Sequence, residues 1–323
     1  MSRRNRHDPR QLDGLLVLNK PTGPTSAACL NRIKHGLGQF KIGHAGTLDP
    51  LARGVLLVLL GQGTKIASYL TGGEKIYSGE FTLGLTSDTY DSEGKILARS
   101  EVTASPEEVA QAVEAWKDLT EQEVPAYSAA KHKGKPLYSL ARAGEDVPVK
   151  SKAVTVFHAE PLEIALPTAR FRVRCSAGTY VRSLVHSLGM RLGCGAIMTQ
   201  LTREASLPFG LEQAHDLEAV LGEPERFAQR VIPLAETLPH WSRLRLSDTL
   251  AAQVKNGAWL PVAETEAEGR AAPGDHAVFL EPGGSPLALV EAQAKDGNLC
   301  WVILRGLWSE EAPRRDKGPG SAS

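Results

Sequence analysis

Short apolar runs and alternating stretches predict several strands in this chain. Residues 14–19 and 55–60 are almost entirely apolar, which is typical of buried strands. Residues 76–83 and 169–175 alternate apolar with polar positions, as half-buried strands do. The polar positions of residues 169–175 are arginines, so we expect one face of that strand to be positively charged.

Three other stretches have the spacing or the end signals of helices. One follows Thr25 or Ser26, either of which can cap it, and carries apolar residues at 30, 33 and 37. Residues 105–118 form an amphipathic stretch that opens on Ser-Pro-Glu-Glu. Residues 181–192 form an apolar stretch behind a Gly-Thr-Tyr turn. The glycine-containing segment 43–54 is expected to be a loop.

The remaining segments suggest how the chain is divided. At 323 residues it is long enough for two domains. A composition change at 233–239 predicts a linker, and residues 241–308 suggest a small β-rich module. We expect residues 1–12 to be a flexible basic N-terminus, 124–148 an exposed arm rich in Lys, Pro and Gly, and 309–323 a disordered tail.

Composition excludes several classes of protein. Hydrophobic residues make up 42% and charged residues 23%, so the chain is not globally disordered. Its four cysteines are scattered without a C-x-x-C pair, which is typical of reduced thiols in a cytosolic protein. No apolar run reaches about 18 residues, and no signal-type segment follows the basic N-terminus. We therefore expect a cytoplasmic protein with no membrane span.

The zero net charge conceals alternating blocks. Residues 1–80 carry a net +6 and residues 131–210 a net +7, whereas 81–130 carry −7 and 211–323 carry −6. Two basic blocks that fold together would form one phosphate-binding face. The alternative is that these blocks are compositional variation along a neutral enzyme.

Several common chemistries have no motif here. The sequence contains no phosphate-binding G-x-x-x-x-G-K-[ST] loop, no complete G-x-G-x-x-G, no H-E-x-x-H and no G-x-S-x-G. We expect neither a metal nor a cofactor. What remains is the segment Gly-His-Ala-Gly-Thr-Leu-Asp-Pro, in which Asp49 precedes a proline and is held out of helical geometry. Asp49 is either a carboxylate presented by a rigid scaffold or an ordinary capped turn.

A second unit follows the arginine-bearing strand. Tyr180 and Arg182 lie where a glycine turn leads into the predicted helix 181–192. An arginine at this place can pair with a carboxylate from elsewhere and keep it ionised, or it can simply cover the start of the helix. Tyr180 and Tyr77 are open to the same two interpretations, as site residues or as structural aromatics.

The order of these motifs resembles that of the bacterial TruB family of tRNA pseudouridine-55 synthases. The motifs are Lys-Pro-Thr-Gly-Pro-Thr-Ser (20–26), Gly-His-Ala-Gly-Thr-Leu-Asp-Pro-Leu-Ala-Arg-Gly (43–54), Lys-Ile-Tyr (75–77), Cys-Ser-Ala-Gly-Thr-Tyr-Val-Arg (175–182) and Leu-Thr-Arg-Glu (201–204). The resemblance implies a catalytic domain at 13–235, and residues 241–308 look like the PUA domain of the family. The implied fold is α+β, a mixed, largely antiparallel sheet with flanking helices plus the β-rich module.

The resemblance also assigns roles to single residues. Asp49 matches the catalytic aspartate, Arg182 the arginine that pairs with it, and Tyr77 and Tyr180 the active-site tyrosines. His44 matches a histidine that contacts the target region of the RNA, Lys20 the lysine of the first motif, and Leu201 a wall of the uracil pocket. Asn19 departs from the Asp that many members carry before this lysine, and Val124-Pro125 has one proline where two are frequent.

By this resemblance the chain would act as a monomer on the T-arm of tRNA, without a guide RNA. It would flip out uridine 55, cleave the N1–C1′ bond, rotate the base and rejoin it through C5. Three alternatives are an RNA-binding protein without catalysis, a synthase guided by a small RNA, and a hydrolase with two carboxylates. The presence of Asp49 disfavours the first, the long arm disfavours the second, and the hydrolase needs a second acid that the motifs do not supply.

Overall fold

The computed structural model describes residues 10–308 except 129, 133, 149, 266, 268, 269 and 296. Most of the N-terminus expected to be flexible and all of the expected tail at 309–323 therefore lie outside the described residues. The chain divides into two compact units, Met1–Val231 and Ile232–Ser323.

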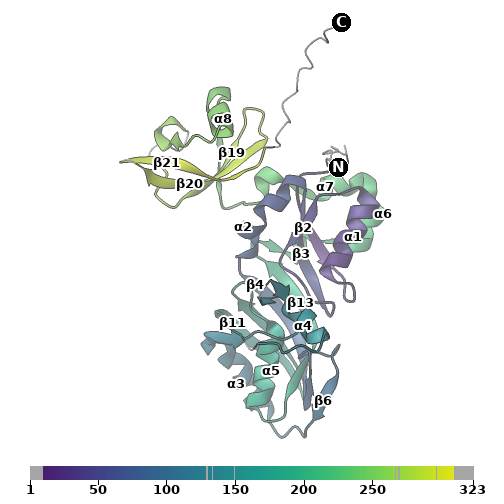
Figure 1. Cartoon of the computed structure of the whole chain (residues 1–323). Coiled ribbons are helices and arrows are strands. Elements are labelled where there is room, and N and C mark those ends of the chain that lie inside the picture. Colours follow the sequence, from purple (N-terminus) through teal and green to yellow (C-terminus); the bar gives the residue numbers. More distant parts are fainter. Residues whose placement is uncertain are drawn as a thin grey trace. The chain divides into compact units, whose positions relative to one another are not determined.

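The first unit is built on one mixed sheet of ten strands (Figure 1). Its main path runs β11-β12-β4-β13-β3-β1-β15, while β2, β14 and β16 pair with β3, β13 and β1. The strands are β1 (Gly14–Lys20), β2 (Ile42–Ala45), β3 (Ala52–Leu60), β4 (Lys75–Leu83), β11 (Val156–Ala165), β12 (Thr168–Cys175), β13 (Ala196–Ser206), β14 (Phe209–Gly210), β15 (His215–Asp216) and β16 (Val231–Pro233). The pairs β1–β15 and β3–β13 are parallel, and the other pairs with a defined register are antiparallel. The predicted mixed, largely antiparallel sheet is confirmed.

The helices of this unit begin where local sequence allows. Helix α1 (Ser26–Leu37) is capped by Thr25, whose side-chain oxygen accepts a hydrogen bond from the backbone N–H of Ala28. Helix α3 (Pro106–Glu114) begins with a capping box between Ser105 and Glu108, and continues as a 3₁₀ turn to Asp118. Helix α5 (Val181–Arg191) packs on β13, and α3 packs on β11 (Figure 1).

Two expectations for this unit were wrong. The segment 43–54 is not one loop, because β2 takes up its beginning and β3 its end, which leaves only residues 46–51 between them. The arm at 124–148 is not merely an exposed stretch. It contains helix α4 (Leu137–Arg142) and a small apolar cluster of Val124, Leu137 and Leu140.

Short elements complete the first unit, and the last of them, η5, lies just past its end at Val231. They are η1 (Gly61–Ile66), α2 (Ala67–Thr71), β5 (Leu85–Ser87), β6 (Ile96–Arg99), η2 (Ala115–Asp118), β7 (Glu121–Glu123), β8 (Lys131–His132), β9 (Lys135–Pro136), β10 (Ser151–Ala153), η3 (Leu211–Gln213), α6 (Leu217–Gly222), η4 (Pro224–Arg226), α7 (Phe227–Arg230) and η5 (Leu234–Glu236). Residues 233–239 are not an open linker, because Leu234, Thr237 and Leu238 are buried.

The second unit has its own sheet and core. Five strands run in the order β17-β19-β20-β21-β18 (Figure 1). They are β17 (Ser242–Arg245), β18 (Leu260–Pro261), β19 (His276–Leu280), β20 (Pro286–Lys295) and β21 (Asn298–Gly306), with helix α8 (Asp248–Lys255) and the 3₁₀ turn η6 (Val262–Glu264). The rings of Phe279 and Trp301 meet edge to face in its core. In the part of the chain described here, no helix combines the length and the apolarity needed to cross a bilayer.

Candidate active site

Asp49 is presented by the short loop 46–51 between β2 and β3. The preceding residue, Leu48, is buried and held at both polar backbone atoms by Ser26: its N–H donates to Oγ at 2.9 Å, and Oγ donates to its carbonyl at 3.0 Å. The backbone N–H of Gly23 donates to the carbonyl of Pro50 at 2.9 Å. The first helix and the segment before it therefore fix the loop on both sides of Asp49.

The side chain of Asp49 faces Arg182 rather than capping a turn. Arg182 Nε donates to Asp49 Oδ2 at 2.9 Å. Two other nitrogens of the guanidinium are bonded to backbone, Nη1 to the carbonyl of Thr89 at 2.7 Å and Nη2 to that of Tyr127 at 3.0 Å. Arg182 is only 5% exposed, whereas Asp49 is 39% exposed. A buried, anchored cation thus holds a carboxylate that remains accessible.

A second carboxylate, Asp91, lies on the same guanidinium. Its Oδ2 is 3.6 Å from Arg182 Nη1, and its Oδ1 accepts hydrogen bonds from the Thr89 hydroxyl and from the backbone N–H of Glu93. Burial raises the pKa of Asp91, while these hydrogen bonds and Arg182 oppose that rise. No sequence motif pointed to Asp91, because its contact with Arg182 joins distant parts of the chain.

Lys20 is buried beneath the same loop. Its Nζ donates to the carbonyls of Pro21 at 2.8 Å and of Ala52 at 2.7 Å. Burial lowers the pKa of Lys20, and Cys29 and Asp49 act in the opposite direction. Lys20 thus joins the end of β1 to the start of β3, next to Asp49. The side chain of Asn19, the departure from the family pattern, donates instead to Asp216 at 2.7 Å.

Tyr77 and Leu201 lie on neighbouring strands, β4 and β13. Tyr77 is directly opposite Arg203 in the register of these strands, and Leu201 is opposite Ala52 on β3. Tyr77 and Leu201 are both buried. Burial raises the pKa of the Tyr77 hydroxyl, and the Arg203 guanidinium opposes this rise.

Arg203 also lies in this region, although no role for it is indicated by the sequence motifs. Its side chain is 1% exposed and donates to the carbonyls of Val55 at 2.6 Å, Gly46 at 3.1 Å and Thr47 at 3.3 Å. It therefore fixes the start of the loop that carries Asp49. The alternation Leu-Thr-Arg-Glu-Ala, in which Arg203 takes an inward position, was the pattern that could have revealed it.

Gly54 allows β3 and β13 to approach each other at this point. It has a φ of +102°, and a Cβ added to it would lie 2.3 Å from the backbone oxygen of Arg203. Only glycine tolerates both this positive φ and so close an approach of another backbone.

His44 lies on β2, opposite Val58, and not in a loop as expected. Its Nδ1 is buried and has no hydrogen-bond partner in the structure. Burial lowers the pKa of His44, and the positive charge of Arg203 lowers it further.

Tyr180 immediately precedes α5 and packs against the apolar cluster of the arm. Its backbone N–H donates to Gln122 Oε1 at 2.5 Å, and Gln122 Nε2 donates to its carbonyl at 3.2 Å. The buried Gln122, which no motif indicated, thus holds the backbone of the residue immediately before α5.

The positively charged strand face was predicted wrongly. The three arginines of β12 are exposed, but each has an acidic partner, on β11, on β13 across β4, or just before β4. The pairs are Arg170 with Glu163 at 3.6 Å, Arg172 with Glu204 at 2.8 Å and Arg174 with Glu74 at 2.5 Å. These pairs neutralise the arginine stripe, so it is not a free phosphate-binding face.

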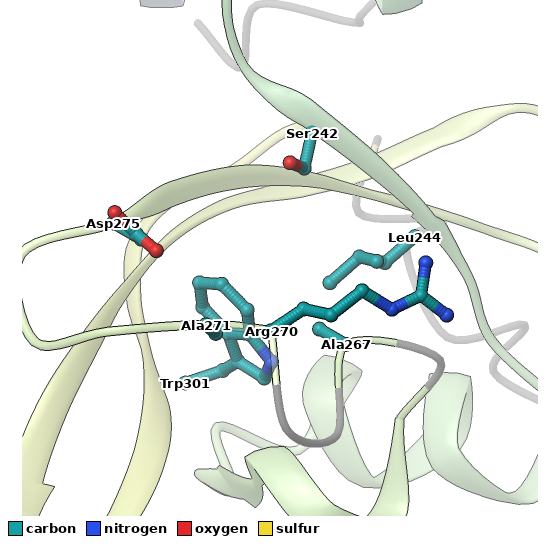
Figure 2. A pocket seen from close by; sticks show the side chains of 7 residues that line it. All are labelled: Ser242, Leu244, Ala267, Arg270, Ala271, Asp275 and Trp301. Carbon is teal, nitrogen blue, oxygen red and sulfur yellow. The ribbon is translucent and has the colours of Figure 1, made fainter.

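A cavity lies elsewhere, in the second unit. It has a volume of about 110 Å³ and is lined by Ser242, Leu244, Ala267, Arg270, Ala271, Asp275 and Trp301 (Figure 2). None of the predicted site residues lines it. Among the described residues, no group of three or more His, Cys, Asp or Glu side chains is arranged to hold a metal ion.

Comparison with known proteins shows which family this chain resembles. Residues 34–181 match the profile of the TruB family pseudouridylate synthase N-terminal domain. The chain is 57% identical over 93% of its length to the tRNA pseudouridine synthase B of Oleidesulfovibrio alaskensis, covering 97% of that protein. It is 55% identical over 94% of its length to the protein of the same name from Nitratidesulfovibrio vulgaris strain Miyazaki F, covering 99% of it.

Solved structures share the fold. The crystal structure of a Cbf5-Nop10-Gar1 complex matches with a TM-score of 0.67 at 25% identity, covering 93% of this chain and 86% of that one. An archaeal box H/ACA sRNP Nop10-Cbf5 complex matches with a TM-score of 0.66 at 23% identity, covering 95% and 90%.

Proposed function

The chain belongs to the TruB family of pseudouridylate synthases, and we propose that it converts uridine 55 in the T-loop of tRNA to pseudouridine. Its relatives' names support tRNA pseudouridine synthase activity, an isomerisation. The contact between Asp49 and Arg182 is the observation that carries the assignment of the catalytic group.

The proposed reaction breaks the N1–C1′ bond, turns the base and joins C1′ to C5, after which C5 loses its proton and N1 carries one. It requires one oxygen nucleophile or base beside the sugar, and Asp49 supplies it as an accessible carboxylate. A carboxylate beside a flipped base loses part of its hydration, so it needs a fixed cationic partner. Arg182 is that partner, and it holds the carboxylate in one orientation.

The other predicted residues have supporting roles in this proposal. Tyr77 stacks on the flipped uracil, and Leu201 forms an apolar wall that retains the base once it is freed. His44 contacts the RNA around the target, and Tyr180 lines the site next to Arg182. Lys20 holds the segment that follows Asp49.

We propose a catalytic domain at 13–235 and a PUA-like module at 241–308 that adds RNA contacts. The arm at 124–148 would take part in binding the T-arm, since its residue Tyr127 already contacts Arg182 through the backbone. The protein would act as a monomer in the cytoplasm, where its tRNA substrate is found.

The test uses the full chain and an unmodified tRNA transcript. After incubation, carbodiimide treatment and primer extension should give one new stop, which maps to position 55. A T-arm hairpin should be modified as well, and no other RNA should be needed. A stop at another position would contradict the site assignment, and a requirement for an added RNA would favour a guided synthase.

A further inference from the structure

Tyr90 has a backbone conformation that tyrosine rarely adopts. Its φ is +64°, and no other residue except glycine has a positive φ in the described part of the chain. A side chain larger than that of glycine is strained in this region, so the surrounding structure must hold it there. Such residues persist only where the surrounding structure holds them, and they cluster at functional sites.

The ring of Tyr90 lies flat on the imidazole of His186. The two ring centroids are 3.8 Å apart and the planes differ by 9°. His186 is on α5, four residues after Arg182, so the two side chains project from the same side of the helix. The Nδ1 of His186 is buried and has no hydrogen-bond partner. The stack is thus maintained although it leaves one polar atom unpaired.

The residues on either side of Tyr90 both contact Arg182. The carbonyl of Thr89 accepts from Nη1 at 2.7 Å, and the carboxylate of Asp91 lies 3.6 Å from the same nitrogen. The positive φ turns the chain sharply between these two residues. On either side of this turn, the Thr89 carbonyl and the Asp91 side chain converge on one guanidinium.

Hydrogen bonds between backbone groups hold this turn on the side of the strands. The carbonyl of Tyr90 accepts from the N–H of Met198 on β13 at 3.1 Å, and the N–H of Tyr90 donates to the carbonyl of Ser87 at 3.3 Å. These bonds tie the turn to the sheet. The stack on His186 is the contact through which the Tyr90 side chain ties the same turn to α5.

We propose that Tyr90 and His186 form a positioning pair, which holds the turn against α5 and so fixes Arg182 for its contact with Asp49. The pair rests on the proposed function, since Arg182 matters for the reaction only if Asp49 is the reacting group. Neither ring touches the substrate in this proposal. Both act through the guanidinium.

Three substitutions at Tyr90 separate the ring from the strain. Tyr90→Ala removes the ring, Tyr90→Phe keeps it, and Tyr90→Gly removes it while accepting a positive φ without strain. We expect kcat on the unmodified tRNA transcript to fall roughly tenfold in the Ala and Gly variants, because a displaced guanidinium misplaces the carboxylate. KM should change by less than about twofold, and Tyr90→Phe should resemble the parent.

Matched changes on α5 test the other half of the pair. His186→Ala should lower kcat as Tyr90→Ala does, and His186→Phe, which restores a flat ring, should recover it. Met190→Ala changes an exposed side chain of the same helix outside the stack and should leave kcat unchanged. Combining Tyr90→Ala with Arg182→Lys should lower kcat by less than the product of the single effects, because both act on one contact.

The outcomes distinguish the two proposals. If the parent chain makes no pseudouridine, the proposed function fails and the positioning pair fails with it. If the parent is active and Tyr90→Ala, Tyr90→Gly and His186→Ala are equally active, only the positioning pair is wrong. A Tyr90→Phe variant as slow as Tyr90→Ala would also overturn it, since the hydroxyl and not the stacked ring would then be responsible.

Discussion

Arg182 Nε lies 2.9 Å from Asp49 Oδ2, and the other two nitrogens of that guanidinium are bonded to the carbonyls of Thr89 and Tyr127. The cation is therefore held at three points, while the carboxylate is held mainly by the cation and by its own short loop. An accessible carboxylate on a rigid anchor keeps one orientation without being buried. Substitutions of Asp49 and of Arg182 should therefore affect the reaction rate in different ways.

Asp49→Asn keeps the size and shape of the side chain but removes its charge and its nucleophilic oxygen. Pseudouridine formation should disappear, while the affinity for tRNA stays within a few-fold of the parent, since a carboxylate does not attract the phosphates that dominate RNA affinity. Single-turnover assays and filter binding measure the two quantities. Comparable turnover in the variant would mean that Asp49 is only a loop residue.

The loss of rate in a variant of Arg182 should depend on how many contacts of the guanidinium the new side chain can still make. Arg182→Lys retains the charge but loses the planar fork, so Asp49 is held less accurately and the rate should fall on the order of a hundredfold. Arg182→Met should be slower still, because it removes the cation that contacts both carboxylates and leaves the carbonyls of Thr89 and Tyr127 without this donor. Rate constants of both variants at saturating tRNA test this order. An active Arg182→Met variant would refute the pairing, although the family assignment would stand.

Features set by local sequence could be predicted, and those set by distant partners could not. The cap at Thr25 and the capping box at Ser105 are formed by residues three positions apart, so the sequence displays them directly. The strand β2 and the helix α4 were missed because each is shorter than the periodicity needed to recognise it.

The same distinction applies to the site. Asp49 and Arg182 could be named from motifs, but Asp91 could not, since only the folded chain brings it to the guanidinium. Charge counting failed on β12 for a related reason. Counting charged residues along the sequence treats Arg172 as an unpaired charge. In the folded sheet, Glu204 on β13 neutralises it.

Stability should fall as the pH drops below about 6.5. Burial lowers the pKa of both His44 and His186 in the folded protein, whereas in the unfolded chain each titrates near its ordinary value. The unfolded state then binds more protons, so the stability these residues contribute is present above about pH 6.5 and is lost as the pH falls through the folded pKa values. Urea unfolding at about pH 7.5 and about pH 5.5 measures the difference.

A control separates these two histidines from general acid effects. The double variant His44→Gln/His186→Phe should lose less stability between the two pH values than the parent does. Equal losses of stability in the two proteins would show that other groups govern the pH dependence.

Gly54→Ala should destabilise the fold by roughly 3 kcal/mol, because the new methyl group meets the backbone of Arg203 and the φ of +102° is strained for alanine. Gly72→Ala is the matched control. Gly72 has a φ of −73° and no atom within 4 Å of an added Cβ, so its change should stay within about 0.5 kcal/mol. Urea midpoints of the two variants check this, and equal midpoints would show that β3 and β13 can separate at little cost.

Ser26→Ala should reduce activity more than its effect on stability explains. It leaves the N–H and the carbonyl of Leu48 without a partner at a buried position, which costs about 1–3 kcal/mol and loosens the residue before Asp49. Thr25→Ala removes the cap of the same helix at a cost of about 1 kcal/mol but does not touch the loop. At a temperature well below both melting transitions, kcat should therefore fall in Ser26→Ala and stay near the parent value in Thr25→Ala. If the two variants lose activity equally, the helix as a whole, and not the hydroxyl of Ser26, holds Asp49 in place.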